Sequence, residues 1–213
     1  MDKTEVKFGE WIEGGFDLYK QNIGTLILAG LIAVVLGLVT VGILAGPMLA
    51  GMLLITLGLF ENAQPKPEFT TVFRGFDFFL NSLLFILVWG VALFILSFIL
   101  GLIPCIGQIV SVFAVLAAQA LLIFGLFLIV DQHMDFWPAS RASFDMIKTN
   151  FWPFLGFSIV ASIIGSIGAI AFGIGLAVTL PIQACILTVA YRDVFGRAEK
   201  ATPVEESPSD EGG

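Results

Sequence analysis

The chain alternates between long apolar stretches and short charged segments. The stretches 21–60, 78–130 and 151–191 contain no Lys, Arg, Asp, Glu or His. The hydrocarbon core of a bilayer is roughly 30 Å thick, so a spanning helix needs about 20 apolar residues. Each stretch can hold two such helices, and Gly and Pro residues mark a turn near its middle. The pattern predicts an all-α membrane protein with six transmembrane helices in three hairpins.

We expect these helices at particular positions. They should cover 23–43, 46–60, 80–102, 107–130, 154–173 and 176–192. Backbone groups in lipid must be hydrogen-bonded internally, which leaves helices or closed barrels, and the stretches lack the alternation of a barrel strand. Composition agrees with a membrane protein, because 58% of the residues are hydrophobic and only 13% are charged, whereas a soluble surface is rich in charge.

The basic residues predict the orientation. All ten Lys and Arg residues fall in the charged segments, which six spans would place on one side of the membrane. Cytoplasmic loops carry an excess of Lys and Arg. We therefore expect a bacterial inner-membrane protein with both termini in the cytoplasm. The 17 acidic residues lie on the same side and give a net charge of -7, so we expect neither a polybasic lipid-binding patch nor a nucleic-acid partner.

A short motif repeats before the first and third stretches, with four identities in seven positions. It comprises Phe16, Asp17, Lys20 and Asn22 in one copy and Phe144, Asp145, Lys148 and Asn150 in the other. Asp and Lys three residues apart can pair on a helix, and Asn can cap the helix that follows. Each residue thus has a local structural role, and we interpret the motif as architectural.

The repeat divides the chain into three units, at about 8–62, 67–135 and 136–196. Pro47 and Pro181 occupy matching positions in the second helices of the outer units. Residues 1–196 then form one transmembrane domain. The segment 197–213 is rich in acids and Pro, and we expect a disordered cytoplasmic tail there.

Each unit begins with an amphipathic segment. In the first unit the apolar residues Phe8, Trp11, Ile12, Gly15, Phe16 and Tyr19 share one helical face. Charged residues occupy the opposite face, which is typical of a helix lying in the membrane interface. The segments 67–79 and 136–151 look like weaker versions.

Two of the expected helices carry ladders of small residues, which let helix backbones approach in lipid. The ladders comprise Ala29, Ala33 and Gly37 in the first helix and Ala161, Gly165, Ala169 and Gly173 in the fifth. Their matching positions suggest packing between the first and third units. Contact within a homo-oligomer is the alternative.

Polar chemistry within the stretches is sparse. Gln119 and Gln183 are the candidates for an intramembrane polar site, and an interhelical hydrogen bond is the simpler reading of each. His133 is the only histidine and lies between two acids, but no His or Cys is near enough in sequence to complete a metal site. No nucleophile, phosphate-loop or dinucleotide motif is present. We therefore expect no enzyme, metal or cofactor. The two cysteines, Cys105 and Cys185, are expected to be small packing residues.

Several short motifs resemble those of a known family. They are Asp131, the run Ser-Arg-Ala-Ser143-Phe-Asp, the pair Leu180-Pro181 and the run Ala190-Tyr-Arg-Asp193. They resemble bacterial six-helix membrane proteins that are similar to the membrane domain of membrane-anchored glycerophosphodiester phosphodiesterases. The resemblance implies a polytopic inner-membrane protein of unassigned role. The phosphodiesterase chemistry of those enzymes resides in a separate soluble domain, so no catalytic residue is carried over.

These observations lead to three hypotheses about function. The first is a non-enzymatic envelope scaffold or accessory component that organises a protein partner or membrane lipid. The second is a transporter of small molecules or lipids, which predicts a cavity near Gln119 or Gln183. The third is a membrane-shaping protein whose hairpins enter only the cytoplasmic leaflet.

Overall fold

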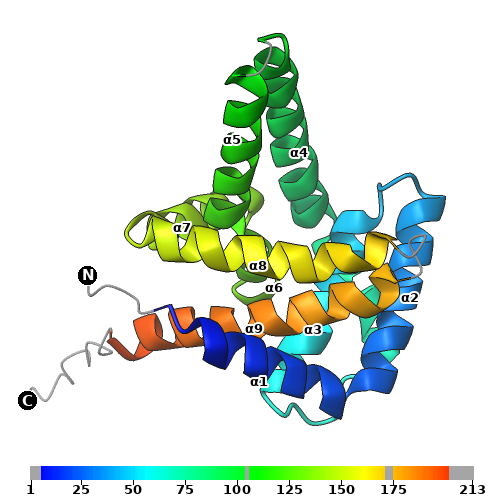
Figure 1. The fold of residues 1–213 in the computed structure, drawn as a ribbon. Helices are drawn as coiled ribbons and strands as arrows, with labels where there is room; N and C mark the ends of the chain where they lie inside the picture. Colours follow the sequence, from blue (N-terminus) through cyan, green and yellow to red (C-terminus); the bar gives the residue numbers. More distant parts are fainter. Residues whose placement is uncertain (1–5, 104–105, 171–174, 202–213) are drawn as a thin grey trace, which may run out of the picture.

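A computed structural model describes residues 6–103, 106–170 and 175–201 (Figure 1). These residues form nine α-helices and one 3₁₀ helix without a strand, so the predicted all-α class is confirmed. The elements are α1 (Phe8–Gln21), α2 (Ile23–Val39), α3 (Ala45–Phe60), η1 (Phe69–Phe78), α4 (Phe79–Gly101), α5 (Ile106–Leu122), α6 (Gly125–Asp131), α7 (Phe136–Lys148), α8 (Phe151–Ile170) and α9 (Leu176–Ala201).

The six predicted spans are confirmed only in part. Four helical segments of the described chain are long and apolar enough to cross a membrane. They are Phe69–Gly101, Ile106–Asp131, Phe151–Gly168 and Leu176–Gly196. A fifth is added if α1 and α2 are counted together, although they are bent by 93°. The structure thus supports a helical membrane protein with four or five candidate spans.

The first hairpin differs from the prediction because its helices are short. The helix expected at 23–43 ends at Val39, and residues 40–44 form the turn. Val41 and Gly42 have positive φ values of 53° and 86° in that turn, which ends regular helix geometry. With 17 and 16 residues, α2 and α3 are each about 25 Å long, less than the hydrocarbon thickness of about 30 Å.

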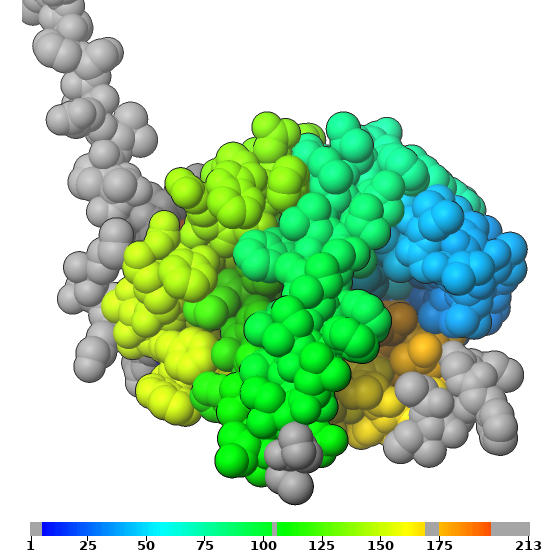
Figure 2. Space-filling model, turned by 90° about the horizontal axis from the view of Figure 1, so that it is seen from above, coloured from blue at the N-terminus to red at the C-terminus, as the bar shows by residue number. Residues whose placement is uncertain are grey.

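The α4–α5 hairpin projects from the rest of the molecule. Figure 1 shows both helices rising steeply away from α8 and α9, and in Figure 2 no other described segment lies over them. In the segment Phe69–Gly101 only 6% of the most apolar window is buried, against 44% for Leu176–Gly196. Large side chains such as Phe94 and Phe98 are therefore exposed, at 71% and 64%.

The amphipathic helix α1 lies along α9 (Figure 1). Gly15 faces Ile186 so closely that a Cβ on Gly15 would lie 2.5 Å from the Ile186 Cα. Trp11 is buried between Phe154 and Phe157 of α8, with ring centroids 6.1 and 4.9 Å away. The apolar face that was predicted to contact the membrane interface is thus covered by protein, and its charged face is exposed.

The other two amphipathic segments have different structures. The segment at 67–79 forms the 3₁₀ helix η1, which packs mainly against α3, and the segment at 136–151 forms the α-helix α7. The helix predicted at 107–130 is interrupted where α7 contacts it. There Ser143 Oγ donates to the Leu121 carbonyl (2.7 Å) and accepts from the Phe124 N–H (3.3 Å). Ser143 thereby satisfies backbone groups at the break between α5 and α6.

Candidate functional site

The first charged residue after each apolar stretch reaches the same place in the fold. Glu61 follows α3, Asp131 ends α6, and Arg192 lies in α9. Arg192 contacts both acids, although the three residues are far apart in sequence. We call Glu61, Asp131, Tyr191 and Arg192 the Arg192 cluster. It ties α9 to the ends of α3 and α6.

Asp131 is the centre of the hydrogen bonding in this cluster. The two terminal nitrogens of Arg192 donate to Asp131 Oδ2 (2.9 Å) and Oδ1 (2.7 Å), which is a bidentate pair. The Tyr191 hydroxyl also donates to Asp131 Oδ2, at 2.7 Å. Glu61 contacts the same terminal nitrogen of Arg192 that donates to Asp131 Oδ1.

The surroundings of the cluster are partly buried. The side chains of Asp131 and Arg192 are 18% and 24% exposed, whereas that of Glu61 is 48% exposed. Tyr191 is fully buried, and its ring stacks on that of Phe127 with centroids 4.9 Å apart. Partial desolvation strengthens the attraction between the guanidinium and the carboxylates. The cluster therefore has the geometry of a structural clamp between helix ends.

A second contact extends this polar region to α1. Trp11 Nε1 donates to Asp193 Oδ2 at 2.9 Å. Asp193 follows Arg192 in α9, so two consecutive residues link α9 to three other elements. With two carboxylates and one guanidinium, the Arg192 cluster carries a formal charge of about -1 at neutral pH. It contains no side chain typical of a nucleophile paired with a base.

The repeated motif lies in the last turns of α1 and α7 and in the residues that lead into α2 and α8. Lys20 lies 3.4 Å from Asp17, and Lys148 lies 2.5 Å from Asp145, both as exposed pairs. The predicted cap by Asn22 is wrong, because its side chain makes no capping bond to α2. Asn22 Nδ2 instead donates to the Leu18 carbonyl in the last turn of α1, at 2.9 Å.

The remaining motif residues occupy unequal environments. Phe16 packs against the core, whereas Phe144 is 45% exposed and lies 5.9 Å from the Lys148 ammonium. Asn150 begins the turn into α8, where its carbonyl accepts from the Phe154 N–H at 3.4 Å. Pro47 and Pro181 are both buried within α3 and α9. Matching sequence positions thus have similar backbones but different neighbours.

The two ladders of small residues both pack on α9. In α2, Ala29 and Ala33 are buried, and a Cβ on the adjacent Gly30 would lie 2.3 Å from the Ala177 carbonyl oxygen. Gly37 has no neighbour at its Cβ position. In α8, Ala161 is buried and Gly165 faces Gln183. The Ala169 side chain and Gly173 lie outside the described residues.

The two candidate intramembrane glutamines lie in different places. Gln119 is exposed on α5, and Gln183 is half-buried between α9 and α8. A Cβ on Gly165 would lie 2.0 Å from Gln183 Oε1, so this amide fills the space beside that glycine. The structure does not bring the two glutamines together.

The structure also describes His133 and one of the two cysteines. His133 is exposed after α6, with its ring centroid 5.2 Å from that of Phe78. No group of three metal-binding side chains occurs in the part of the chain that the structure describes. Cys185 is a free thiol buried in α9, and Cys105 lies outside the described residues.

Sequence reasoning noted Asp131, Tyr191 and Arg192 only as motif residues and passed over Glu61. The sequence did contain a signal for the cluster. Glu61, Asp131 and Arg192 are each the first charged residue after an apolar stretch, and Arg192 is opposite in charge to the two acids. These opposite charges would have predicted that Arg192 pairs with the two acids.

Comparisons of the chain with protein-family models, with curated proteins and with solved structures gave no match. The resemblance to membrane domains of glycerophosphodiester phosphodiesterases therefore stays a prediction.

Proposed function

We propose that the protein is a non-enzymatic integral membrane scaffold of the bacterial inner membrane, with both termini in the cytoplasm. It organises membrane lipid or a protein partner around the α4–α5 hairpin. One observation carries the proposal: the hairpin exposes apolar side chains along its length, and the rest of the described chain leaves it uncovered. Such a surface requires lipid or another protein to cover it.

The base of the hairpin supports the same role. Trp89 Nε1 in α4 donates to Ser140 Oγ in α7 at 2.9 Å, and Asn81 Nδ2 donates to Asp135 Oδ1 at 3.2 Å. Together with Ser143 at the α5–α6 break, these contacts hold both hairpin helices on α7. The Arg192 cluster then fixes α6 to α3 and α9. A held base with an uncovered hairpin supports the scaffold proposal.

Photo-crosslinking in native membranes tests this proposal. A photoreactive phenylalanine analogue replaces Phe98, which is 64% exposed on α4, and in a control protein it replaces Phe154, which is fully buried. We expect the probe at position 98 to crosslink to lipid or to one defined protein, and the probe at 154 to crosslink only within the chain. Crosslinks from position 98 to α2 or α8 would contradict the proposal. Native mass spectrometry in nanodiscs identifies the captured lipid or protein.

Transport is less well supported by the positions of the glutamines. A transporter of polar solutes needs convergent polar groups around a water-filled path. Gln119 is exposed on the hairpin and Gln183 packs beside Gly165, so the two amides do not form such a path.

Membrane shaping is the second candidate, and the inclination of the hairpin favours it. In Figure 1 the α4–α5 hairpin projects steeply away from α8 and α9, which run across beneath its lower end. Hairpins that splay in this way can act as a wedge in one leaflet. A single cysteine at position 102, introduced as Leu102→Cys with Cys105 and Cys185 replaced, distinguishes the two roles. An impermeant thiol reagent outside the cell should label position 102 in a spanning scaffold, whereas a wedge in the inner leaflet would stay unlabelled.

A further inference from the structure

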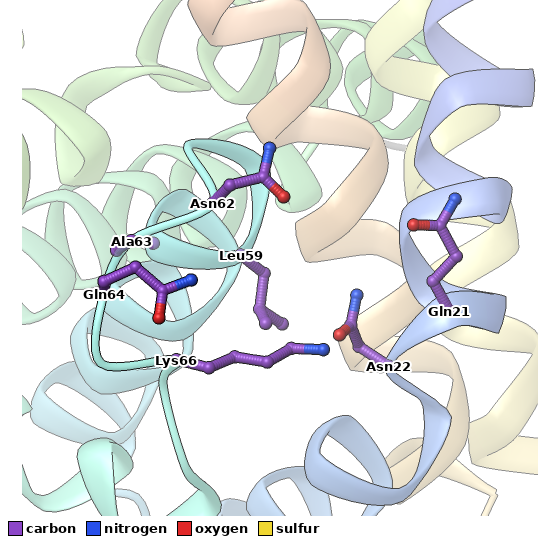
Figure 3. A pocket seen from close by; sticks show the side chains of 8 residues that line it. Gln21, Asn22, Leu59, Asn62, Ala63, Gln64 and Lys66 are labelled. Atoms are coloured by element: carbon purple, nitrogen blue, oxygen red, sulfur yellow. The ribbon is translucent and has the colours of Figure 1, made fainter.

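A small polar cavity lies at the corner between α1 and α2. Its volume is about 210 Å³, which is larger than the space of a few water molecules. Residues from the corner and from the end of α3 with its following loop line it. Its polar side chains are Gln21, Asn22, Asn62, Gln64 and Lys66 (Figure 3). We call this space the corner cavity.

The charge of the lining favours an anion. Lys66 is the charged residue in the lining, which includes no carboxylate. Its side chain extends toward Asn22 across the cavity (Figure 3) and forms no ion pair with any residue that the structure describes. The adjacent acid, Glu61, contacts Arg192 instead. Primary amides of the other side chains add neutral N–H donors.

The loop that carries this lining is held by the end of α3. The Asn62 N–H donates to the Leu59 carbonyl (3.3 Å), and the Ala63 N–H donates to the Gly58 carbonyl (2.9 Å). Asn62 has a φ of 53°. This bonding is a Schellman motif with Asn in the left-handed position. The backbone on this side of the corner cavity is therefore fixed by its own hydrogen bonds, and the side chains of this loop provide the donors for a ligand.

Asn22 adds a requirement for a hydrogen-bond donor in the ligand. Its Nδ2 is used by the Leu18 carbonyl, which fixes the amide orientation. Its Oδ1 is buried and has no hydrogen-bond partner among the described residues. Leaving a buried acceptor without a donor costs free energy, because its hydrogen bond to water is not replaced. A ligand hydroxyl or ammonium group would remove that cost.

The position of the corner cavity favours a lipid as the source of the anion. It lies where the charged helix α1 meets the apolar helix α2, and Ile23 and Leu31 of α2 are 49% and 43% exposed. Headgroups of a bilayer lie at such a boundary, and acyl chains lie on the apolar side.

We propose that the corner cavity binds the phosphate of an anionic glycerophospholipid, with phosphate oxygens on Lys66 and a headgroup hydroxyl donating to Asn22 Oδ1. Acyl chains run along α2 past Ile23. The lipid assignment rests on the proposed membrane placement, whereas phosphate binding does not. This site lies apart from the α4–α5 hairpin and gives the scaffold a defined lipid.

Native mass spectrometry of the full chain in a non-ionic detergent tests the site. The ligands are dioctanoyl phosphatidylglycerol, dioctanoyl phosphatidylcholine, which has no headgroup N–H or O–H donor, and inorganic phosphate. We compare the wild type with Lys66→Gln. The matched control is Lys20→Gln, which removes the same charge from an exposed residue of α1 outside the lining. A second variant, Gln64→Glu, adds a carboxylate to the lining.

We expect phosphatidylglycerol to bind one-to-one and more tightly than phosphatidylcholine. Lys66→Gln and Gln64→Glu should each weaken it by roughly tenfold or more, as expected for loss of a charge-assisted hydrogen bond. Lys20→Gln should bind as the wild type does. Binding of inorganic phosphate alone, lost in Lys66→Gln, would support the oxyanion site and assign it to a soluble ligand.

Two outcomes would overturn the proposal. One is equal affinity for phosphatidylcholine and phosphatidylglycerol, and the other is equal weakening by Lys66→Gln and Lys20→Gln. Neither outcome involves the hairpin, so crosslinking from position 98 would still test the scaffold separately.

Discussion

Individual charged residues differ in how many helices they connect. Arg192, within α9, contacts the ends of two other helices, whereas the ion pair of Lys148 is with a neighbour three residues away. Exposed pairs of the second kind contribute at most about 0.5 kcal/mol. The number of ion pairs is therefore a poor guide to the stability of this chain. We expect the partly buried pairs to contribute more than the exposed ones.

Replacing Arg192 with Met should destabilise the protein by about 2–3 kcal/mol, because charge-assisted hydrogen bonds are lost and Asp131 is left partly buried without its counter-ion. Thermal unfolding in detergent measures the change. Lys148→Met is the matched control and should change stability by less than about 0.5 kcal/mol. Equal losses in the two variants would show that the Arg192 cluster is not a clamp.

The two acids of the cluster should not be equivalent. Asp131 accepts three hydrogen bonds and is 18% exposed, whereas Glu61 contacts Arg192 alone and is 48% exposed. We therefore expect Asp131→Asn to lower the unfolding temperature more than Glu61→Gln does. The opposite order in the same thermal assay would place the stronger interaction on Glu61.

Helix–helix contacts are the next scale. Gly15→Ala should separate α1 from α9, because the new Cβ would lie 2.5 Å from the Ile186 Cα. Overpacking of this kind costs about 1–3 kcal/mol. Gly9→Ala on the same helix has nothing within 4 Å of its Cβ and should be neutral or stabilising, since Ala favours helix over Gly by up to about 1 kcal/mol. Thermal unfolding followed by tryptophan fluorescence compares the two variants. Equal stability of the two would contradict the close contact.

Ser143 should stabilise the chain at the break between α5 and α6. Ser143→Ala removes the partner of the Phe124 N–H and of the Leu121 carbonyl, at an expected cost of about 1–3 kcal/mol. Hydrogen exchange at the Phe124 amide should accelerate. Ser166→Ala, at an exposed serine of α8, should leave that amide unchanged, and unchanged exchange in both variants would argue against the bridge.

Local sequence predicted elements better than it predicted their assembly. The apolar run that forms α4 was placed within one residue at each end, because it follows from local composition. The break at Phe124 was missed, since it depends on Ser143 in a later helix. The cover over Trp11 was missed for the same reason, because Phe154 and Phe157 lie far along the chain. The four-residue spacing of small residues such as Ala29 and Ala161 predicts that they are buried. It does not predict that both pack on α9.

At the scale of the whole molecule, the exposed hairpin should be intolerant of charge if lipid surrounds it. Phe94→Arg places a charge in the middle of α4, where insertion into a bilayer costs about 2.5–3.5 kcal/mol. We expect less of this variant in the membrane fraction. Phe69→Arg, at a 38% exposed residue of η1 near the charged loops, is the control and should insert normally. Normal insertion of Phe94→Arg would indicate a hairpin in water or against a polar partner.

The order of the Arg192 cluster along the chain has a consequence for biosynthesis. Glu61 and Asp131 leave the ribosome before Arg192, so the two acids lack their contact with Arg192 until α9 is made. The Arg192 cluster can form only when α3, α6 and α9 are all present. A chain that stops before Arg192 keeps two like charges where its helices should meet, and its turnover in a pulse-chase experiment should be faster than that of a chain ending just after α9. Stable packing of α3 and α6 against each other is therefore expected only after α9 has been made.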